Sequence, residues 1–137
     1  FALTEPAAGS DVRGLQTTID RDGDHYIVNG QKKFITRAST ADWFVVIGRT
    51  RDTPSSFNAV LIPRDAPGLQ ICPEAGKLGW YGVPISSLVF DKVRVPAANR
   101  MGQEGVEDNK KQKKIARLMT LTFSLKKLKL LIRSCQN

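Results

Sequence analysis

The sequence has little of what metal sites and disulfide frameworks require. Its 137 residues include two cysteines and one histidine. Cys72 and Cys135 lie far apart without ligand-like spacing, so we expect neither a disulfide framework nor a metal site. Cys72 follows the apolar strand pattern of Leu69 and Ile71, which predicts a buried thiol. The histidine, His25, is expected to point to solvent from a strand.

Long apolar runs are also absent. No stretch of 18 apolar residues occurs, so the sequence predicts no membrane-spanning helix. The chain begins with Phe1 instead of methionine and has no charged leader before its first apolar residues. We therefore expect an internal segment of a longer protein, whose compartment cannot be read from a targeting signal.

Acidic residues are fewer than basic ones, but the imbalance is confined to one end. The formal net charge is +8. Residues 106–137 hold nine Lys and Arg against Glu107 and Asp108, a net +7, whereas the remainder holds 12 basic and 11 acidic residues, a net +1. The main part of the chain is nearly neutral, so we expect no nucleic-acid partner.

Between residues 12 and 96, glycine and proline interrupt the chain too often for long helices. Residues 43–47 and 58–63 form apolar runs, and residues 88–95 alternate between apolar and polar. The Asp22-Gly23 and Asn29-Gly30 pairs are hairpin-turn signals. About seven to eight short strands at this spacing predict an all-β domain, an antiparallel barrel or sandwich, over residues 1–105.

The tail from residue 106 to residue 137 has a different character. Apolar residues at helical spacing alternate with lysines, which predicts a basic helix or a disordered tail. A frame change, a retained intron or a truncated gene model is the preferred explanation. The alternatives are a solvated or partly ordered terminal helix and, least favoured, docking to a membrane or an acidic partner.

The first residues contain the most specific pattern. A short apolar run, residues 1–3, leads through Thr4-Glu5-Pro6 into the small-residue loop 7–11. Small residues allow a ligand close to the backbone, and consecutive amides suit phosphate oxygens. Taken alone, the loop is more typical of a strand followed by a turn.

The complete string over residues 1–14 resembles the first signature of the acyl-CoA dehydrogenase family. Residues 29–36, Asn-Gly-Gln-Lys-Lys-Phe-Ile-Thr, and residues 87–96, which include Phe-Asp-Lys-Val-Arg-Val-Pro, are similar to two further family motifs. The three motifs occur in the family's order, and the resemblance extends to about Gly105. It implies the family's middle domain, an antiparallel β-barrel.

The resemblance also implies a cofactor, FAD, and the residues that contact it. Leu3 and Thr4 correspond to the flavin's pyrimidine edge, Phe34 takes the position of a family tryptophan, and Thr36 corresponds to a hydroxyl near flavin N5. The implied flavin contacts are Phe1, Leu3, Thr4, Gly9, Ser10, Phe34, Ile35 and Thr36. Ser10 and, more weakly, Ser56 are implied to contact coenzyme A.

No catalytic residue is expected within this chain. The family's base comes from a C-terminal domain that this sequence does not contain, and Glu5 belongs to the signature itself. Pro6, which follows Glu5 and has a fixed φ, favours a structural role for that glutamate.

The function implied by the resemblance is that of a segment of an FAD-dependent oxidoreductase of fatty-acid β-oxidation, which converts acyl-CoA to 2,3-enoyl-CoA. The isolated chain is expected to be inactive. The complete enzyme is expected to be a homo-oligomer that uses electron-transfer flavoprotein or another acceptor, in the mitochondrial matrix or bacterial cytoplasm. The alternatives are an acyl-CoA oxidase and a non-catalytic flavin- or CoA-binding module whose basic tail docks to a membrane or acidic partner.

Overall fold

The computed structural model describes residues 1–52, 56–102 and 106–107. The chain divides into two compact units, Phe1–Gly105 and Val106–Asn137. Of the second unit, only the two-residue strand β7 (Val106–Glu107) is described. The predictions for the rest of the basic tail therefore lie outside the described residues.

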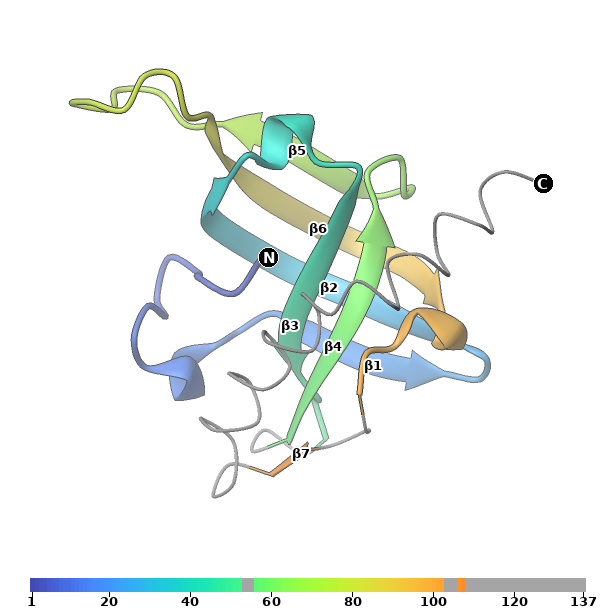
Figure 1. Cartoon of the computed structure of the whole chain (residues 1–137). Helices are drawn as coiled ribbons and strands as arrows, with labels where there is room; N and C mark the ends of the chain where they lie inside the picture. Colours follow the sequence, from blue (N-terminus) through green and yellow to red (C-terminus); the bar gives the residue numbers. More distant parts are fainter. Residues whose placement is uncertain (53–55, 103–105, 108–137) are drawn as a thin grey trace. The chain divides into compact units, whose positions relative to one another are not determined.

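The first unit consists mostly of β-strands, as predicted (Figure 1). Within it the six strands follow the order β5-β6-β2-β1-β3-β4 in one sheet. Short 3-10 helices connect some of them. The strands are β1 (Thr18–Asp22), β2 (His25–Thr36), β3 (Trp43–Arg49), β4 (Ser56–Pro63), β5 (Leu69–Pro73) and β6 (Ile85–Pro96), and the 3-10 helices are η1 (Val12–Gly14), η2 (Ala38–Thr40) and η3 (Ala97–Asn99).

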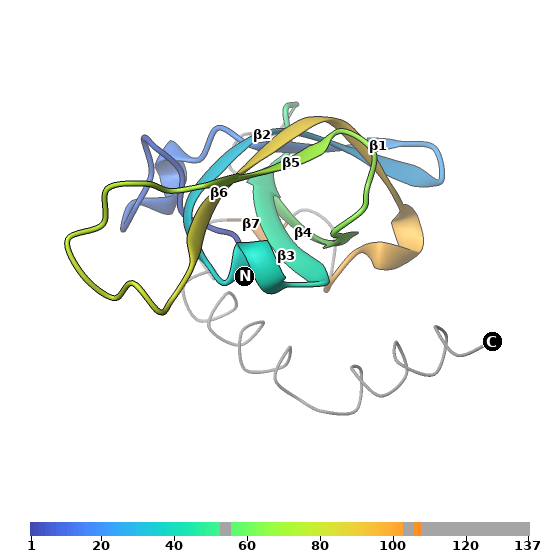
Figure 2. The ribbon, with the colours of Figure 1, turned by 90° about the horizontal axis from the view of Figure 1, so that it is seen from above.

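The sheet is mixed and open, so the prediction of a closed antiparallel barrel is wrong. The pair β1 and β3 is parallel and is joined by a single Cα pair, Thr18 and Arg49. In the described part of the chain, β4 and β5 do not pair to close the sheet. Figure 2 shows that β3 and β4 instead cross beneath the other four strands.

Glycine permits the close crossing at which the sheet folds over. A Cβ atom on Gly48 of β3 would lie 2.6 Å from the carbonyl oxygen of Thr17, immediately before β1. A side chain at this position would push the two strands apart. The two layers that result enclose the core, and they are joined through a brief β1–β3 contact.

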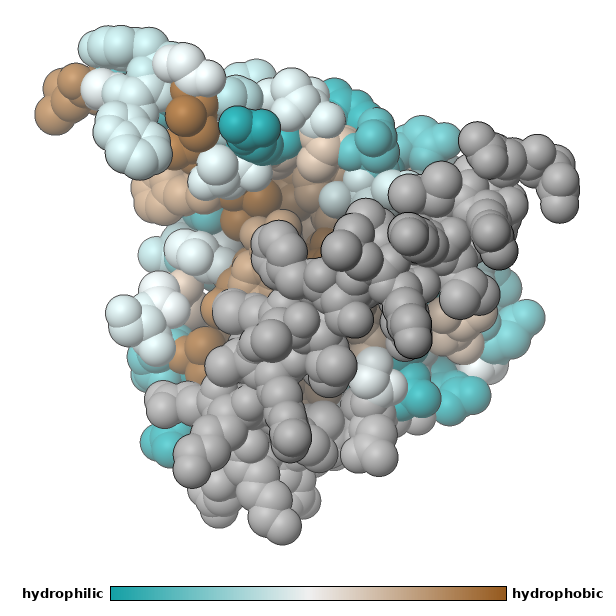
Figure 3. Space-filling view, in the orientation of Figure 1, coloured by the Kyte–Doolittle hydropathy of each residue, from teal (hydrophilic) through white to brown (hydrophobic). Residues whose placement is uncertain are grey.

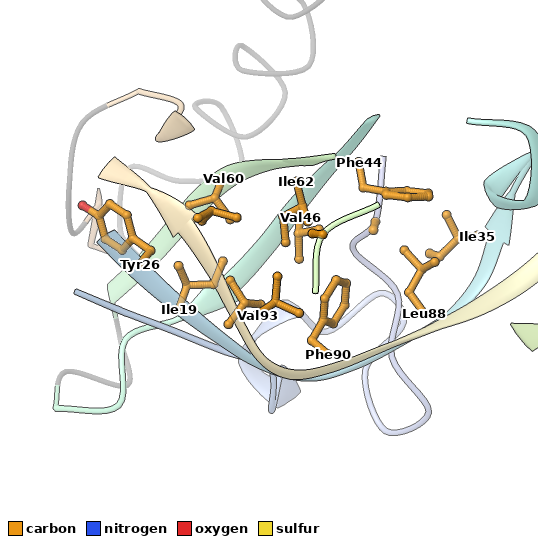
Figure 4. Packing of buried hydrophobic residues seen from close by; sticks show 14 of the residues in the cluster. Ile19, Tyr26, Ile35, Phe44, Val46, Val60, Ile62, Leu88, Phe90 and Val93 are labelled. Atoms are coloured by element: carbon orange, nitrogen blue, oxygen red, sulfur yellow. The ribbon is translucent and has the colours of Figure 1, made fainter. Parts of the chain in front are cut away.

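The hydrophobic core lies between these two layers (Figure 4). Phe44 and Val46 of β3 face Leu88 and Phe90 of β6, and all four side chains are at most 3% exposed. Buried and less buried positions alternate along most of β2 and β6, as expected for strands with one face toward a core, whereas residues 56–60 of β4 are all buried. Burial of each such side chain stabilises the fold by about 1.5–3 kcal/mol.

One of the two predicted hairpin turns is present. Asp22 pairs with His25, and Gly23 between them has φ +61°, which confirms the Asp22-Gly23 turn. The turn predicted at Asn29-Gly30 is wrong, because both residues lie inside β2. Gly30 has φ +132°, and a Cβ atom there would lie 2.7 Å from Thr17 Cα, so this glycine serves a strand crossing.

The buried thiol predicted for Cys72 is also wrong. Leu69 and Ile71 of β5 pack partly against the core, whereas Gln70 and Cys72 are exposed. Cys72 has the opposite strand parity to its apolar neighbours, and β5 lies at the end of the sheet. His25, in contrast, lies partly exposed on the side of β2 opposite the buried Tyr26, in line with the prediction.

Candidate functional site

The first four residues lie between β2 and β3 and are hydrogen-bonded to both. Ala2 N–H donates to the Val45 carbonyl at 2.8 Å, and Ile47 N–H donates to the Ala2 carbonyl at 3.2 Å. On the other side, Lys33 N–H donates to the Thr4 carbonyl at 2.8 Å. The first and second sequence motifs are therefore in direct contact. Leu3 and Thr4, half-buried, lie at the point where they meet.

Glu5 closes the loop that follows. Its carboxylate accepts hydrogen bonds from Gln16 N–H at 2.5 Å, Thr17 N–H at 3.1 Å and Lys32 Nζ at 2.7 Å. The side chain of Glu5 is 2% exposed. Residues 6–15 therefore form a loop whose two ends are joined by one buried carboxylate.

Lys32 is buried because it follows the inward parity of β2. Tyr26 and Val28 point into the core, and Lys32 lies in phase with them at 0% exposure. Its ammonium donates to the Leu3 carbonyl at 2.9 Å as well as to Glu5. Among the described residues, no other lysine or arginine is buried.

The environment changes the pKa values of both partners. Burial disfavours the charged ammonium and lowers the pKa of Lys32 from 10.5 to about 8, although Glu5 opposes this shift. For Glu5, burial alone raises the pKa. The hydrogen bonds from Lys32, Thr17 and Gln16 outweigh it and hold the pKa below its usual value of 4.5. Both groups are therefore charged near neutral pH.

A β-bulge in β2 sets the direction of Phe34. Lys32 pairs with Leu88 and Ile35 pairs with Ser86, so β2 carries one extra residue opposite β6. Phe34 has φ +60°, an uncommon conformation for a bulky residue. The bulge reverses the strand parity, which places Ile35 in the core and leaves Phe34 and Thr36 exposed.

Phe34 is 59% exposed, and the Lys33 ammonium lies 5.1 Å from the centroid of its ring. Phe1 is 48% exposed. Both residues adjoin the anchored backbone in sequence, Phe1 next to Ala2 and Phe34 next to Lys33, which makes this surface a candidate for contact with another molecule. Strained backbone at Phe34 is a further feature that concentrates at ligand-binding sites.

The loop 6–15 presents small residues to solvent. Glu5 and Ala8 exchange two backbone hydrogen bonds in a tight turn, and Gly9 and Ser10 beyond it are exposed. Among the described residues, apart from its chain neighbours, no atom lies within 4 Å of a Cβ atom placed on Gly9. The packing of this chain does not require glycine there. The space that a side chain would fill is open to a ligand.

The structure brings most of the expected cofactor residues into one region. The Thr4–Lys33 hydrogen bond brings the segment with Leu3 and Thr4 next to the strand residue that precedes Phe34. Glu5 follows Thr4 directly and begins the loop that contains Gly9 and Ser10. The Ile35 side chain is in the core, 4% exposed, so only its backbone can contact a ligand. Ser56 is 5% exposed in β4.

Sequence reasoning missed Lys32, Gln16 and Thr17 as parts of this region. For Lys32 the signal was its position in an alternating strand. It lies two residues after Gly30 and four after Val28, so all three share one face of the strand. The backbone donors of Gln16 and Thr17 carry no sequence signal.

A second exposed apolar group lies on the connection between β5 and β6, which projects from the sheet in Figures 1 and 3. Leu78, Trp80 and Tyr81 are 101%, 82% and 76% exposed. Lys77 Nζ donates to the carbonyls of Trp80 at 2.8 Å and Val83 at 2.6 Å, which holds the turn together. None of the predicted cofactor residues lies in this turn.

The candidate site is a surface formed by backbone and side chains, without a metal cluster. In the described part of the chain no group of three potential ligands is close enough to bind a metal ion. The same residues contain no helix that is long and apolar enough to span a membrane. A shallow hollow elsewhere includes none of the expected cofactor residues and is lined by Asp20, Arg21, Asp22, Ile27, Asn29, Arg51 and Asp52.

Comparison with known proteins gives a consistent result. Residues 1–93 match the family model described as acyl-CoA dehydrogenase, middle domain. The mitochondrial isobutyryl-CoA dehydrogenase of Dictyostelium discoideum is 40% identical over 107 residues, which are 77% of this chain and 26% of that protein. The chain thus spans about a quarter of the length of this relative.

Solved structures agree. A glutaryl-CoA dehydrogenase from Mycobacterium smegmatis, solved in complex with FADH2, is 36% identical to this chain with a TM-score of 0.71. The aligned region covers 77% of this chain and 27% of that enzyme's chain. A chain in the structure titled electron transferring flavoprotein of Acidaminococcus fermentans is 37% identical with a TM-score of 0.71 and covers 77% and 28%.

Proposed function

Because this chain belongs to the acyl-CoA dehydrogenase family and matches its middle domain, we propose that it supplies the flavin-contacting segment of an FAD-dependent enzyme that oxidises acyl-CoA thioesters to 2,3-enoyl-CoA. The chain spans only about a quarter of a relative's length, and it contributes one wall of a larger active site.

The observation that carries this proposal is the exposed, anchored surface around Thr4 and Phe34. The bulge in β2 turns an aromatic ring outward on strained backbone, next to a segment held from both sides. An exposed ring with 59% of its surface free is costly to leave in water but suits a planar aromatic ligand.

The residues present fit FAD. Phe34 and Phe1 offer apolar area for the ring system, and Thr4 and Thr36 offer hydroxyls and backbone groups for its polar edge. Gly9 and Ser10 offer an open loop for the pyrophosphate. When bound, FAD would accept the hydride from the β-carbon of the substrate. The chain's own residues bind the cofactor, orient it and exclude water from one side.

We infer that the described residues do not provide the base that removes the α-proton. Among the described residues Glu5 is the sole buried carboxylate, and three donors already occupy it. A base must be free to accept a proton at the substrate. We therefore infer that the isolated chain has no dehydrogenase activity, and that any acyl-CoA turnover by the purified chain would contradict this inference.

The broader assignments follow from the relatives. By likeness to the structure titled electron transferring flavoprotein, an electron-transfer flavoprotein is the proposed electron acceptor of the complete enzyme. By likeness to the Dictyostelium protein, described as mitochondrial, the proposed compartment is the mitochondrion in a eukaryote, or the cytoplasm in a bacterium. Ser10 remains the proposed coenzyme A contact. The oxidase alternative depends on oxygen access and is decided by stopped-flow reoxidation of the complete enzyme.

Titration of the purified chain with FAD by equilibrium dialysis tests the proposal. Phe34→Ala should weaken binding by about tenfold, since loss of one aromatic stacking surface costs roughly 1–3 kcal/mol. Trp80→Ala is the matched control, because Trp80 is also exposed and also has positive φ, 54°. Equal loss in both variants, or no saturable binding by the unmodified chain, would contradict the proposal.

A further inference from the structure

The buried ammonium of Lys32 reaches two segments at once. It donates to the Leu3 carbonyl at 2.9 Å and to the Glu5 carboxylate at 2.7 Å. Because Glu5 also binds the amides of Gln16 and Thr17, one lysine side chain connects β2, the first residues and the start of β1. The side chain of Lys32 is 0% exposed, so it cannot contact a ligand on the surface.

Stability alone does not explain a charged pair at this position. A buried ion pair is often no more stabilising than apolar residues of similar volume, because both charges lose their hydration. Other inward positions on β2 are occupied by Tyr26, Val28 and Ile35, so an apolar residue would match the core. What an apolar residue cannot supply is a donor to the Leu3 carbonyl.

We propose that Lys32 is a positioning residue for the flavin surface: it fixes the backbone of Leu3 and Thr4 through the Leu3 carbonyl and Glu5, without touching the cofactor. This inference rests on the proposed function for its consequence, flavin affinity. Its structural part, the fixed conformation of Leu3 and Thr4, stands independently of any ligand.

The experiment separates positioning from stability with three variants. Lys32→Met alone leaves the Glu5 carboxylate buried and unpaired, so it should lose both stability and flavin affinity. The double variant Lys32→Met with Glu5→Gln removes the unpaired charge and should recover part of the stability. The recovery is not full, because the glutamine oxygen can accept from only one of the two amides that bond separate Glu5 oxygens. The Leu3 carbonyl still lacks its donor. Lys92→Met is the control, since the side chain of Lys92 is exposed and the hydrogen bond from Lys92 to the Asn29 side chain uses only the Lys92 backbone amide.

Two readouts are compared for each variant. Equilibrium dialysis with FAD should show about tenfold weaker binding in the double variant, the effect of one charge-assisted hydrogen bond, and no change in Lys92→Met. Amide hydrogen exchange without flavin should show faster exchange at Lys33, whose N–H donates to Thr4. Urea unfolding reports the recovery of stability.

The outcomes distinguish this inference from the proposed function. If affinity and Lys33 protection recover together with stability in the double variant, Lys32 has a purely structural role and the inference is wrong. If the unmodified chain does not bind FAD, the proposed function fails, and the exchange at Lys33 still decides whether Lys32 fixes the segment. Slow exchange at Lys33 in the double variant overturns the inference in either case.

Discussion

Two regions of the molecule present large apolar side chains to solvent, and they are held in different ways. Phe34 lies beside a segment anchored by a fully buried ion pair and by hydrogen bonds to β2 and β3. Trp80 lies on a projecting turn that is closed by Lys77. Both residues have positive φ, so local strain does not distinguish them.

The difference lies in how deeply each region is connected to the core. Glu5 and Lys32 are buried, whereas the side chains at the tip of the second region are almost fully exposed. We infer that the first region is a preorganised surface and that substitutions behind it affect the whole fold. Substitutions on the projecting turn should have local effects only.

The largest expected effect is at the buried pair. Lys32→Met should lower the free energy of unfolding by about 3–5 kcal/mol, because it leaves the Glu5 carboxylate buried without its counter-charge. Urea denaturation followed by circular dichroism measures the change. If Lys32→Met lowered the free energy of unfolding by less than a typical surface substitution does, the region around Phe34 would be no more firmly anchored than the projecting turn around Trp80.

Close backbone crossings behind the first region should be nearly as sensitive. Gly30→Ala should destabilise the fold by about 3 kcal/mol, because Gly30 has φ +132° and its Cβ atom would lie 2.7 Å from Thr17 Cα. Gly76→Ala is the matched control on the projecting connection, where φ is also positive, +74°, but a Cβ atom would meet no non-neighbouring atom of the described residues within 4 Å. Thermal unfolding of the two variants should differ, and equal losses would mean that backbone strain, not the crossing, sets the cost.

Stability should depend on pH through Lys32. Its pKa is lowered from 10.5 to about 8 in the folded chain, so above pH 8 the unfolded state binds more protons than the folded state. The free energy of unfolding contributed by this group therefore rises between about pH 8 and 10.5, by roughly 3 kcal/mol, since one pKa unit corresponds to about 1.4 kcal/mol. The Glu5 carboxylate is the charged group that faces Lys32, and it stays ionised throughout this range.

Urea titrations across this pH range, with Lys32→Met for comparison, measure the slope. In Lys32→Met the free energy of unfolding should not rise between about pH 8 and 10.5. If the unmodified chain and the variant have parallel pH profiles, Lys32 does not titrate as its surroundings indicate.

The smallest effect is expected on the projecting turn. Trp80→Ala should change the free energy of unfolding by no more than about 0.5 kcal/mol, because the side chain is 82% exposed and its loss removes little packing. Chemical denaturation checks this value. A loss comparable with that of Lys32→Met would overturn the contrast between the two regions.

Much of the local structure follows from sequence patterns. The apolar runs at 43–47 and 58–63 correspond to β3 and β4, and the Asp22-Gly23 turn is present. These features depend on residues close together in the chain. The family resemblance implies that the first and second motifs lie at one site. The hydrogen bond between Lys33 and Thr4, which joins the two motifs, fits this expectation.

What could not be predicted depends on distant contacts. Asn29-Gly30 satisfies the rule for a turn, yet Gly30 serves the crossing with Thr17. The bulge that exposes Phe34 is defined by its register with β6. The prediction of a closed barrel depends on the number of strands and on the family resemblance. In the structure the sheet is open: β1 and β3 share a single Cα pair, and β4 and β5 do not pair within the described residues.

The most direct test of the central claim, that the anchored region is a flavin-binding surface, is FAD binding by Gly9→Ala. In the part of the chain that the structure describes, no atom beyond the chain neighbours lies within 4 Å of a Cβ at Gly9, so the substitution should leave the unfolding free energy within about 0.5 kcal/mol of the unmodified chain. The account predicts that FAD affinity nevertheless falls by about tenfold, because the methyl group occupies the space proposed for the pyrophosphate. Unchanged FAD affinity at unchanged stability would contradict it.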